Sequence, residues 1–273
     1  MSEMELITSR KLVSRFHPYH GENILLTEDN TVAYRKTSFA NALIFSEKPL
    51  MPGEIFLVEI EKNERGWSGY MRIGLTQLDP EVAAFSQGPL PQYALPDLTI
   101  MSTSWVFAIT KTQNNIYEYG TIGLIPKSNS DPKYFLGDVN NVRTSRGIIP
   151  RSVLRPSTSI PSQDILPTDV GSRIGIVYVP QSRSSNGELA EMHFIINGED
   201  QGPCSKGIPL RKGPLYAVID VYGTTKQVRI IQLYGVATLQ SLCRDAILQH
   251  IQKTAVSSLP LPKTLIEYLM YQS

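Results

Sequence analysis

The sequence predicts a mainly β protein, an antiparallel β-sandwich followed by a small α-helical region at the C-terminal end. Three observations predict it. Between Phe16 and Gly235 the apolar runs are short and separated by Gly, Pro, Asn and Asp, as in antiparallel β proteins. Several runs alternate apolar and polar residues, which is the pattern of a strand with one buried face. After Gly235 the apolar residues recur with the period of a helix.

The strands are expected where these apolar runs lie: residues 23–26, 32–36, 42–45, 54–60, 69–75, 105–110, 173–179, 191–196, 215–221 and 227–233. Two of the connections have the residues that hairpin turns need. Asp29-Asn30 separates the first two strands, and Asn197-Gly198 follows the strand that ends at Ile196. Because Asn and Gly accept positive φ, both dipeptides predict tight hairpins.

Four regions of the chain follow from this pattern. We expect an N-terminal tail at residues 1–15, the sandwich at residues 16–235 and the helical region at residues 236–273. Within the sandwich, residues 126–167 contain Ser, Pro and Arg with little periodicity and exceed the length of an ordinary loop. They are therefore expected to form a long, partly disordered insertion.

The insertion carries a run of arginines with no acidic residue between them: Arg143, Arg146, Arg151 and Arg155. Such a run is typical of a solvated loop. The alternative is a contact with an acidic or phosphorylated partner, because guanidinium groups pair with carboxylates and phosphates in bidentate fashion.

The bulk composition argues against several classes of function. The 26 basic residues nearly balance the 25 acidic ones, so the strong field of a nucleic-acid or membrane-surface binder is missing. Cys204 and Cys243 lie far apart, which suggests neither a disulfide framework nor a zinc site and favours a reducing compartment. The first 15 residues lack the apolar core of a signal peptide, and no apolar run approaches 18 residues. We therefore expect a cytoplasmic protein that does not insert into membranes.

No catalytic or metal-binding constellation is evident. His17 and His20 flank a proline and have no third ligand beside them, so no metal is expected. The run Gly66-Trp67-Ser68-Gly69 departs from the spacing of a nucleophile elbow. The sequence predicts no cofactor, no catalytic residue and no enzymatic activity.

The C-terminal region reads as two helices. From Thr238, a plausible N-cap, to Lys253 the apolar residues fall on one face, and Arg244, Asp245, Gln249 and Gln252 lie on the other. Residues 257–262 break the pattern, and a shorter helix is expected at residues 263–270. An apolar face of this size must dock either on the sandwich or on a partner.

This region resembles a SOCS box. Thr238-Leu239, Cys243 and Ile247 follow the spacing of the Elongin-binding element, and Leu259-Pro260-Leu261-Pro262 is similar to a cullin box of the form that selects cullin-5. The two prolines predict a rigid, extended segment. The resemblance implies contacts with Elongin C, in complex with Elongin B, through Thr238, Leu239, Leu242, Cys243, Ala246 and Ile247. It implies contacts with cullin-5 through Leu259, Pro260, Leu261 and Pro262.

The sandwich resembles the neuralized homology repeat. The resemblance rests on residues 16–23, on residues 38–46, on the run from Gly66 to Thr76 and on Ile195-Ile196-Asn197-Gly198. It implies a SPRY-like β-sandwich that holds substrate proteins for ubiquitin transfer, while Elongin B, Elongin C, cullin-5 and a RING subunit supply the scaffold. For family members with one repeat and a SOCS box, the implied substrates are β-catenin and muscle proteins.

The residue types suggest one candidate substrate surface, formed by Asn41, Trp67, Tyr70 and Arg72, because aromatic and Arg side chains dominate binding hot spots. The alternative for Trp67 is a place in the core of the sandwich. The alternative for the whole chain is a non-catalytic sandwich that binds a peptide or glycan as a scaffold, with its helical tail packed intramolecularly.

Overall fold

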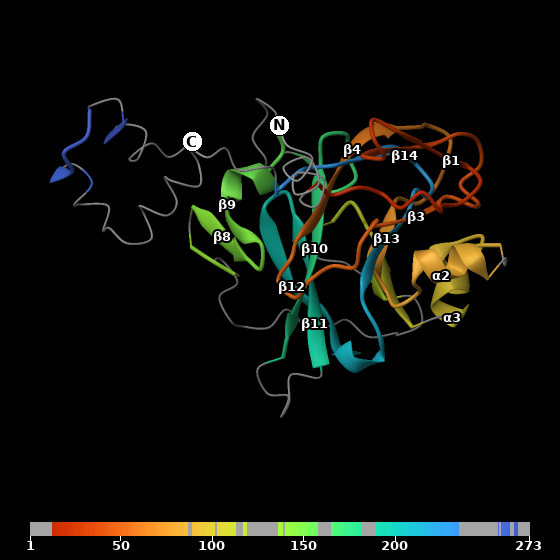
Figure 1. Cartoon of the computed structure of the whole chain (residues 1–273). Helices are drawn as coiled ribbons and strands as arrows, with labels where there is room; N and C mark the ends of the chain where they lie inside the picture. Colours follow the sequence, from red (N-terminus) through yellow and green to blue (C-terminus); the bar gives the residue numbers. More distant parts are fainter. Residues whose placement is uncertain are drawn as a thin grey trace, which may run out of the picture. The chain divides into compact units, whose positions relative to one another are not determined.

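The computed structural model describes residues 13–86, 89–101, 103–112, 117–118, 136–138, 140–157, 165–181, 189–234, 256, 258–262 and 265–266 (Figure 1). The chain divides into two compact units. Residues Ser14–Leu233 form one, here called the sandwich unit, and Met1–Val13 with Tyr234–Ser273 form the other, here called the tail unit.

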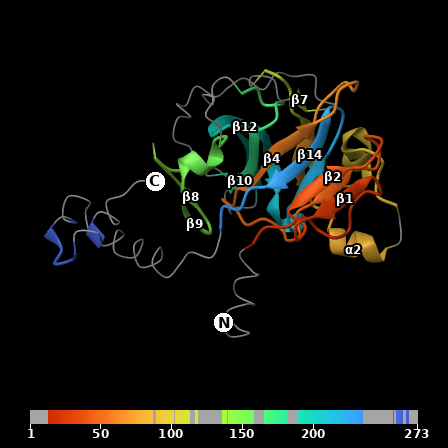
Figure 2. The same ribbon diagram turned by 90° about the horizontal axis from the view of Figure 1, so that it is seen from above.

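The first layer of the sandwich unit is an antiparallel sheet of seven strands. Their order across the sheet is β1 (Ile24–Thr27), β2 (Val32–Arg35), β14 (Thr225–Ile230), β4 (Phe56–Asn63), β10 (Arg173–Pro180), β11 (Leu189–Ile196) and β12 (Glu199–Pro209). Strands β4, β14 and β10 cross the middle of the view in Figure 2. Alternate residues of β11, such as Met192, Phe194 and Ile196, point into the core, as the period of a strand requires.

The second layer is an antiparallel sheet of five strands, in the order β3 (Leu43–Phe45), β13 (Tyr216–Asp220), β5 (Arg72–Thr76), β6 (Ser104–Ala108) and β7 (Tyr117–Glu118). The core lies between the two sheets. Phe107 of β6 meets Phe194 of β11 edge to face, with ring centroids 5.8 Å apart. The predicted fold class is therefore confirmed, and each predicted strand is present with its ends shifted by at most three residues.

A short helical segment covers the outer face of the five-stranded sheet (Figure 1). It consists of α2 (Pro80–Phe85), the irregular turn η1 (Ala94–Leu98) and α3 (Thr99–Met101). Leu95 and Leu98 pack with Phe45 and Val218, which buries the outward side of β3 and β13. These helices are not evident in the sequence pattern, because each is too short for a helical period and the segment contains prolines.

Part of the expected insertion is an ordered hairpin. Strands β8 (Asn141–Thr144) and β9 (Gly147–Pro150) lead into the helical turn η3 (Arg151–Leu154). At the tip, Arg146 forms an ion pair of 2.9 Å with the buried Glu54, just before β4. Arg173 of β10 donates a hydrogen bond of 2.8 Å to the carbonyl of Val153. These bonds tie the hairpin to β4 and β10.

The two predicted hairpin turns are confirmed. Between β1 and β2, Asp29 and Asn30 both have positive φ. Between β11 and β12, Asn197 has φ 51° and Gly198 has φ 87°, and Ile196 pairs with Glu199 across the turn. This is a two-residue turn in which both central residues take positive φ.

The tail unit is described at few positions. The predicted helix at residues 238–253 lies outside the described residues. Leu265 and Ile266, within the predicted second helix, are helical, and their amides donate to the carbonyl of Pro262. The prediction of an extended Leu259–Pro262 segment was wrong. The amide of Leu261 donates to the carbonyl of Leu259 across 2.8 Å, because the fixed φ of Pro260 also suits the centre of a γ-turn.

Candidate substrate-binding surface

Four connections of the sandwich unit meet and are held together by hydrogen bonds. They are residues 36–42 after β2, residues 64–71 between β4 and β5, residues 91–93 before η1 and residues 221–224 between β13 and β14. Asn41 donates to the carbonyl of Gln92 across 2.8 Å, and Thr224 donates to that of Gly69 across 2.9 Å. Gly223 has φ 59°, and a Cβ there would lie 2.4 Å from the carbonyl oxygen of Gly69. A glycine is therefore required where these two loops touch.

Arg35 supports the surface from below. Its side chain is fully buried at the end of β2 and donates to the carbonyls of Thr37, Gly223 and Thr225. It also forms an ion pair of 3.4 Å with Glu64. Burial lowers the pKa of the guanidinium, and the charge of Glu64 counteracts that shift. One buried side chain thus fixes three of the four connections.

Glu64 fixes the orientation of Trp67. Its carboxylate accepts a 2.9 Å hydrogen bond from the indole Nε1 of Trp67 and a 3.0 Å bond from Lys226. The bond from Lys226 is the main cause that lowers the pKa of Glu64 below its usual value, so the carboxylate stays charged. The polar edge of the indole is occupied, and Trp67 remains 42% exposed. Its ring therefore offers apolar contact to a partner.

Four aromatic side chains, here called the aromatic surface, gather on these connections: Phe39, Trp67, Tyr93 and Tyr222. Phe39 lies at the centre. Its ring centroid is 5.0 Å from that of Trp67, 4.7 Å from that of Tyr222 and 6.1 Å from that of Tyr93. All four keep part of their surface exposed. Partly exposed aromatic clusters of this kind are typical of protein-binding hot spots.

Arg72 borders the aromatic surface. Its guanidinium carbon lies 3.6 Å from the ring centroid of Tyr222, and its Nη1 contacts the carbonyl of Leu95 at 3.1 Å and the carboxylate of Asp220 at 3.3 Å. Asp220 is fully buried, and burial raises its pKa to about 6, although the amide of Ala94 and Arg72 act in the opposite direction. The pair holds the guanidinium over the ring of Tyr222.

The structure brings together two of the four residues suggested by sequence, Trp67 and Arg72. The alternative that Trp67 fills the core is wrong, because 42% of it is exposed. Asn41 lies at the edge, with φ 56°, and its backbone joins the connections. Tyr70 lies apart from the ring cluster, with the ammonium of Lys111 6.0 Å from its ring centroid. The contributions of Phe39, Tyr93 and Tyr222 were missed, since their meeting depends on loops distant in sequence.

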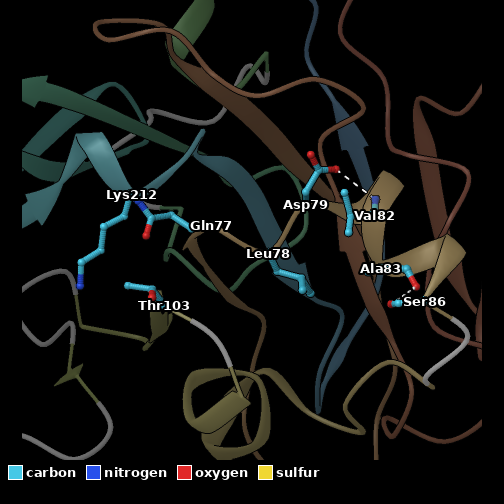
Figure 3. A pocket seen from close by; sticks show the side chains of 8 residues that line it. All are labelled: Gln77, Leu78, Asp79, Val82, Ala83, Ser86, Thr103 and Lys212. Atoms are coloured by element: carbon cyan, nitrogen blue, oxygen red, sulfur yellow. Dashed lines mark hydrogen bonds between the residues drawn. The ribbon is translucent and has the colours of Figure 1, made fainter.

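A separate hollow of about 550 Å³ lies beside α2 (Figure 3). Its lining residues are Gln77, Leu78, Asp79, Val82, Ala83, Ser86, Thr103 and Lys212. The carboxylate of Asp79 caps α2, and the hydroxyl of Ser86 donates to the carbonyl of Ala83. These polar groups are therefore engaged in the local structure, and no histidine or cysteine is among the lining residues.

The described part of the chain contains no group of three potential metal ligands from His, Cys, Asp and Glu. No described helix has the length and hydropathy needed to cross a membrane. In the arginine run, Arg146 and Arg151 are held internally, by Glu54 and by the carbonyl of Asp138, whereas Arg143 and Arg155 are exposed. The run is therefore no continuous binding surface.

Comparisons with known proteins agree with this architecture. The Neuralized family model matches residues 16–232, and the SOCS box model matches residues 235–270. The chain is 40% identical to Neuralized-like protein 2 from Homo sapiens over 272 residues, which cover 95% of this chain and 92% of that protein. It is 36% identical to E3 ubiquitin-protein ligase NEURL3 from Homo sapiens over 92 residues, which cover 33% of this chain and 34% of that protein.

Among solved structures, the neuralized-nhr1 domain of Drosophila melanogaster aligns with a TM-score of 0.52 at 23% identity, covering 80% of this chain and 97% of that domain. This likeness supports the fold. The family model and the relative that matches nearly its whole length identify the chain as a member of the Neuralized family with a C-terminal SOCS box.

Proposed function

We propose that this protein is the substrate-recognition subunit of a cytoplasmic ubiquitin ligase assembled with Elongin B, Elongin C, cullin-5 and a RING subunit. The observation that carries the proposal is the SOCS box match at residues 235–270, directly after a Neuralized domain. SOCS boxes join substrate-binding domains to such ligases. The relative named E3 ubiquitin-protein ligase NEURL3 adds support for a role in ubiquitin transfer.

In this proposal the chain binds and positions substrate, and the RING subunit brings the catalytic machinery. The described residues offer an aromatic surface suited to protein recognition. The proposed substrate contacts are Trp67 and Arg72 with Phe39, Tyr93 and Tyr222, while Asn41 and Tyr70 lie at the border. By family resemblance, β-catenin and muscle proteins are the substrates to test first.

The proposed Elongin contacts lie on one face of the helix that the sequence predicts from Thr238 to Lys253. Leu239 and Cys243 are one turn apart, and Leu242, Ala246 and Ile247 extend the same apolar face. A face with small and medium side chains suits insertion into the groove of another protein.

The proposed cullin contacts lie at the turn of the tail unit. Pro260 and Pro262 are exposed, and Leu259 and Leu261 are half-buried. A turn pre-set by prolines loses little conformational entropy when it docks. The proposed cullin-binding element is therefore a preformed turn and not an extended segment.

Co-expression with Elongin B and Elongin C tests the adaptor half of the proposal. We expect the full chain to co-elute with both, and Leu239→Asp to abolish co-elution because a charge enters the apolar groove. Gln249→Asp, on the polar face of the same helix, is the matched control and should retain binding. A wild-type chain that elutes alone would refute the ligase role.

The cullin half has a separate test. In the Elongin-bound complex, replacing both Leu259 and Leu261 by Ala should weaken cullin-5 binding at least about tenfold, since two apolar anchors of about 1.5–3 kcal/mol each are lost. Elongin binding should not change. Equal affinity of the variant for cullin-5, measured by interferometry, contradicts the assignment of these residues.

A further inference from the structure

The end of the sandwich unit that carries the aromatic surface is positively charged, although the whole chain is nearly neutral. The segments that form it and border it contain six cationic and four acidic residues: Arg35, Lys36, Arg65, Arg72, Lys111 and Lys226 against Glu22, Glu64, Asp97 and Asp220. The formal net charge of the complete chain is only +1. Positive charge is therefore concentrated here.

Three of the four acidic residues are engaged within the fold, and the fourth, Glu22, is exposed. Glu64 is paired with Arg35 and Lys226, and Asp220 is buried against Arg72. Asp97 accepts a hydrogen bond of 3.2 Å from the amide of Tyr93.

The exposed cations of this region, by contrast, form no ion pair within the described residues. Lys36 and Arg65 have no side-chain hydrogen bond or ion pair with another described residue, and Lys111 contacts only the ring of Tyr70 within the described part of the chain. Lys36 begins one of the four connections, and Arg65 lies two residues before Trp67 in another. The electrostatic potential at this surface is therefore dominated by cations that have no ion-pair partner among the described residues.

Arg72 adds a specific anchor. Its Nη1 is used by Leu95 and Asp220, while its Nε and Nη2 have no hydrogen-bond partner among the described residues. The side chain is 13% exposed, and its contacts with Tyr222, Leu95 and Asp220 fix its position. A guanidinium edge with two parallel N–H donors matches the two oxygens of a carboxylate.

We propose that the aromatic surface binds an acidic peptide segment, in which one carboxylate pairs with the Nε–Nη2 edge of Arg72 and a neighbouring large apolar side chain lies against Trp67 and Phe39. Lys36 and Arg65 attract further acidic residues of the same segment. This inference rests on the proposed function, because it assigns the chemical class of the substrate.

A peptide array tests the proposal with the full chain bound to Elongin B and Elongin C. The probes are nine-residue peptides with one Trp, Phe or Leu, in which the flanking positions are Glu, Gln or Lys. We expect Glu peptides to bind at least tenfold more tightly than their Gln counterparts, with an affinity that falls as salt is added. Phosphoserine versions show whether a phosphate replaces the carboxylate. Selection of the Gln or Lys peptides would overturn the proposal.

Two sets of variants locate the site. Arg72→Gln should lose about tenfold in affinity for the Glu peptide, and Arg72→Lys should recover only part, since an ammonium lacks the two-donor edge. If Arg72→Gln unfolds because Asp220 is left unpaired, the exposed double change Lys36→Glu and Arg65→Glu decides instead, because it should invert the preference from Glu to Lys peptides. Arg143→Gln, exposed on β8, is the control. An unchanged preference in the double variant would refute the site.

The result is separable from the ligase role. If the chain does not bind the Elongins, the peptide array is run on the chain alone. Selection of acidic peptides in that case refutes the ligase proposal and supports this inference. If the chain binds the Elongins and cullin-5 but does not select acidic peptides, the ligase proposal stands and this inference is refuted.

Discussion

At the scale of single residues, buried charged side chains hold the connections beneath the aromatic surface in place. Arg35 and Asp220 are both fully buried, and each meets its counter-charge at more than 3 Å. Burial is the main cause of the pKa shift of both groups. Such residues make stability depend on pH and on the presence of both partners.

Asp220 should make the protein less stable as the pH rises from about 4 to about 6. Its folded pKa of about 6 exceeds the unfolded value of 3.8, so the folded state binds more protons in this window. The unfolding free energy of wild type minus that of Asp220→Asn should fall by about 2 kcal/mol across the window. Urea titrations followed by tryptophan fluorescence measure it, since both tryptophans lie in the sandwich unit. A pH-independent difference would contradict the burial effect; Glu22→Gln, at an exposed site, is the control.

Arg35→Met should destabilise the sandwich unit by about 3–5 kcal/mol. The methionine removes the donor for three loop carbonyls and leaves Glu64 without one of its cations. Arg143→Met, at an exposed position of β8, should change stability by less than about 0.5 kcal/mol. A loss below about 1 kcal/mol for Arg35→Met, in chemical unfolding at pH 7, would show that the loops hold without it.

At the scale of elements, the hairpin β8–β9 depends on a buried ion pair. Glu54→Gln should remove this ion pair and loosen the tip of the hairpin, at a cost of about 2–4 kcal/mol locally. Trypsin should then cleave after Arg143 or Arg146 several times faster than in wild type. Glu22→Gln provides the control, and equal cleavage rates in the two variants would argue that the pair is dispensable.

Sequence patterns predicted the strands that carry runs of apolar residues and missed those whose residues disfavour a strand. The core strands and the Asn197-Gly198 turn were predictable because apolar period and turn chemistry agree there. Strand β12 was missed because it contains Gly202, Pro203, Gly207 and Pro209. Such residues are tolerated at a sheet edge, and edge position is set by the tertiary fold.

At the scale of the whole molecule, a truncation after residue 234 should keep the sandwich unit folded. The sandwich unit contains both sheets and their shared core, and the chain divides near this position. We expect a melting temperature within about 3 °C of the full chain and complete loss of Elongin binding. A drop beyond about 10 °C would favour the alternative in which the helical tail packs on the sandwich. Differential scanning fluorimetry distinguishes the two.

The site could be predicted only in part. Trp67 and Arg72 were identifiable by residue type, because exposed aromatic and Arg side chains are common at binding surfaces. Phe39, Tyr93 and Tyr222 come from three other connections, and only the topology brings their rings within 4.7–6.1 Å. The surface is thus a property of the assembled sandwich.

The prolines of β12 also restrict how this protein meets other chains. β12 is the longest strand and ends the seven-stranded sheet, yet Pro203 and Pro209 lack amide hydrogens and its pairing with β11 shifts register three times. An irregular edge cannot template an incoming strand. A partner chain with an exposed strand would therefore not extend the seven-stranded sheet at β12, which limits edge-to-edge association with other β proteins.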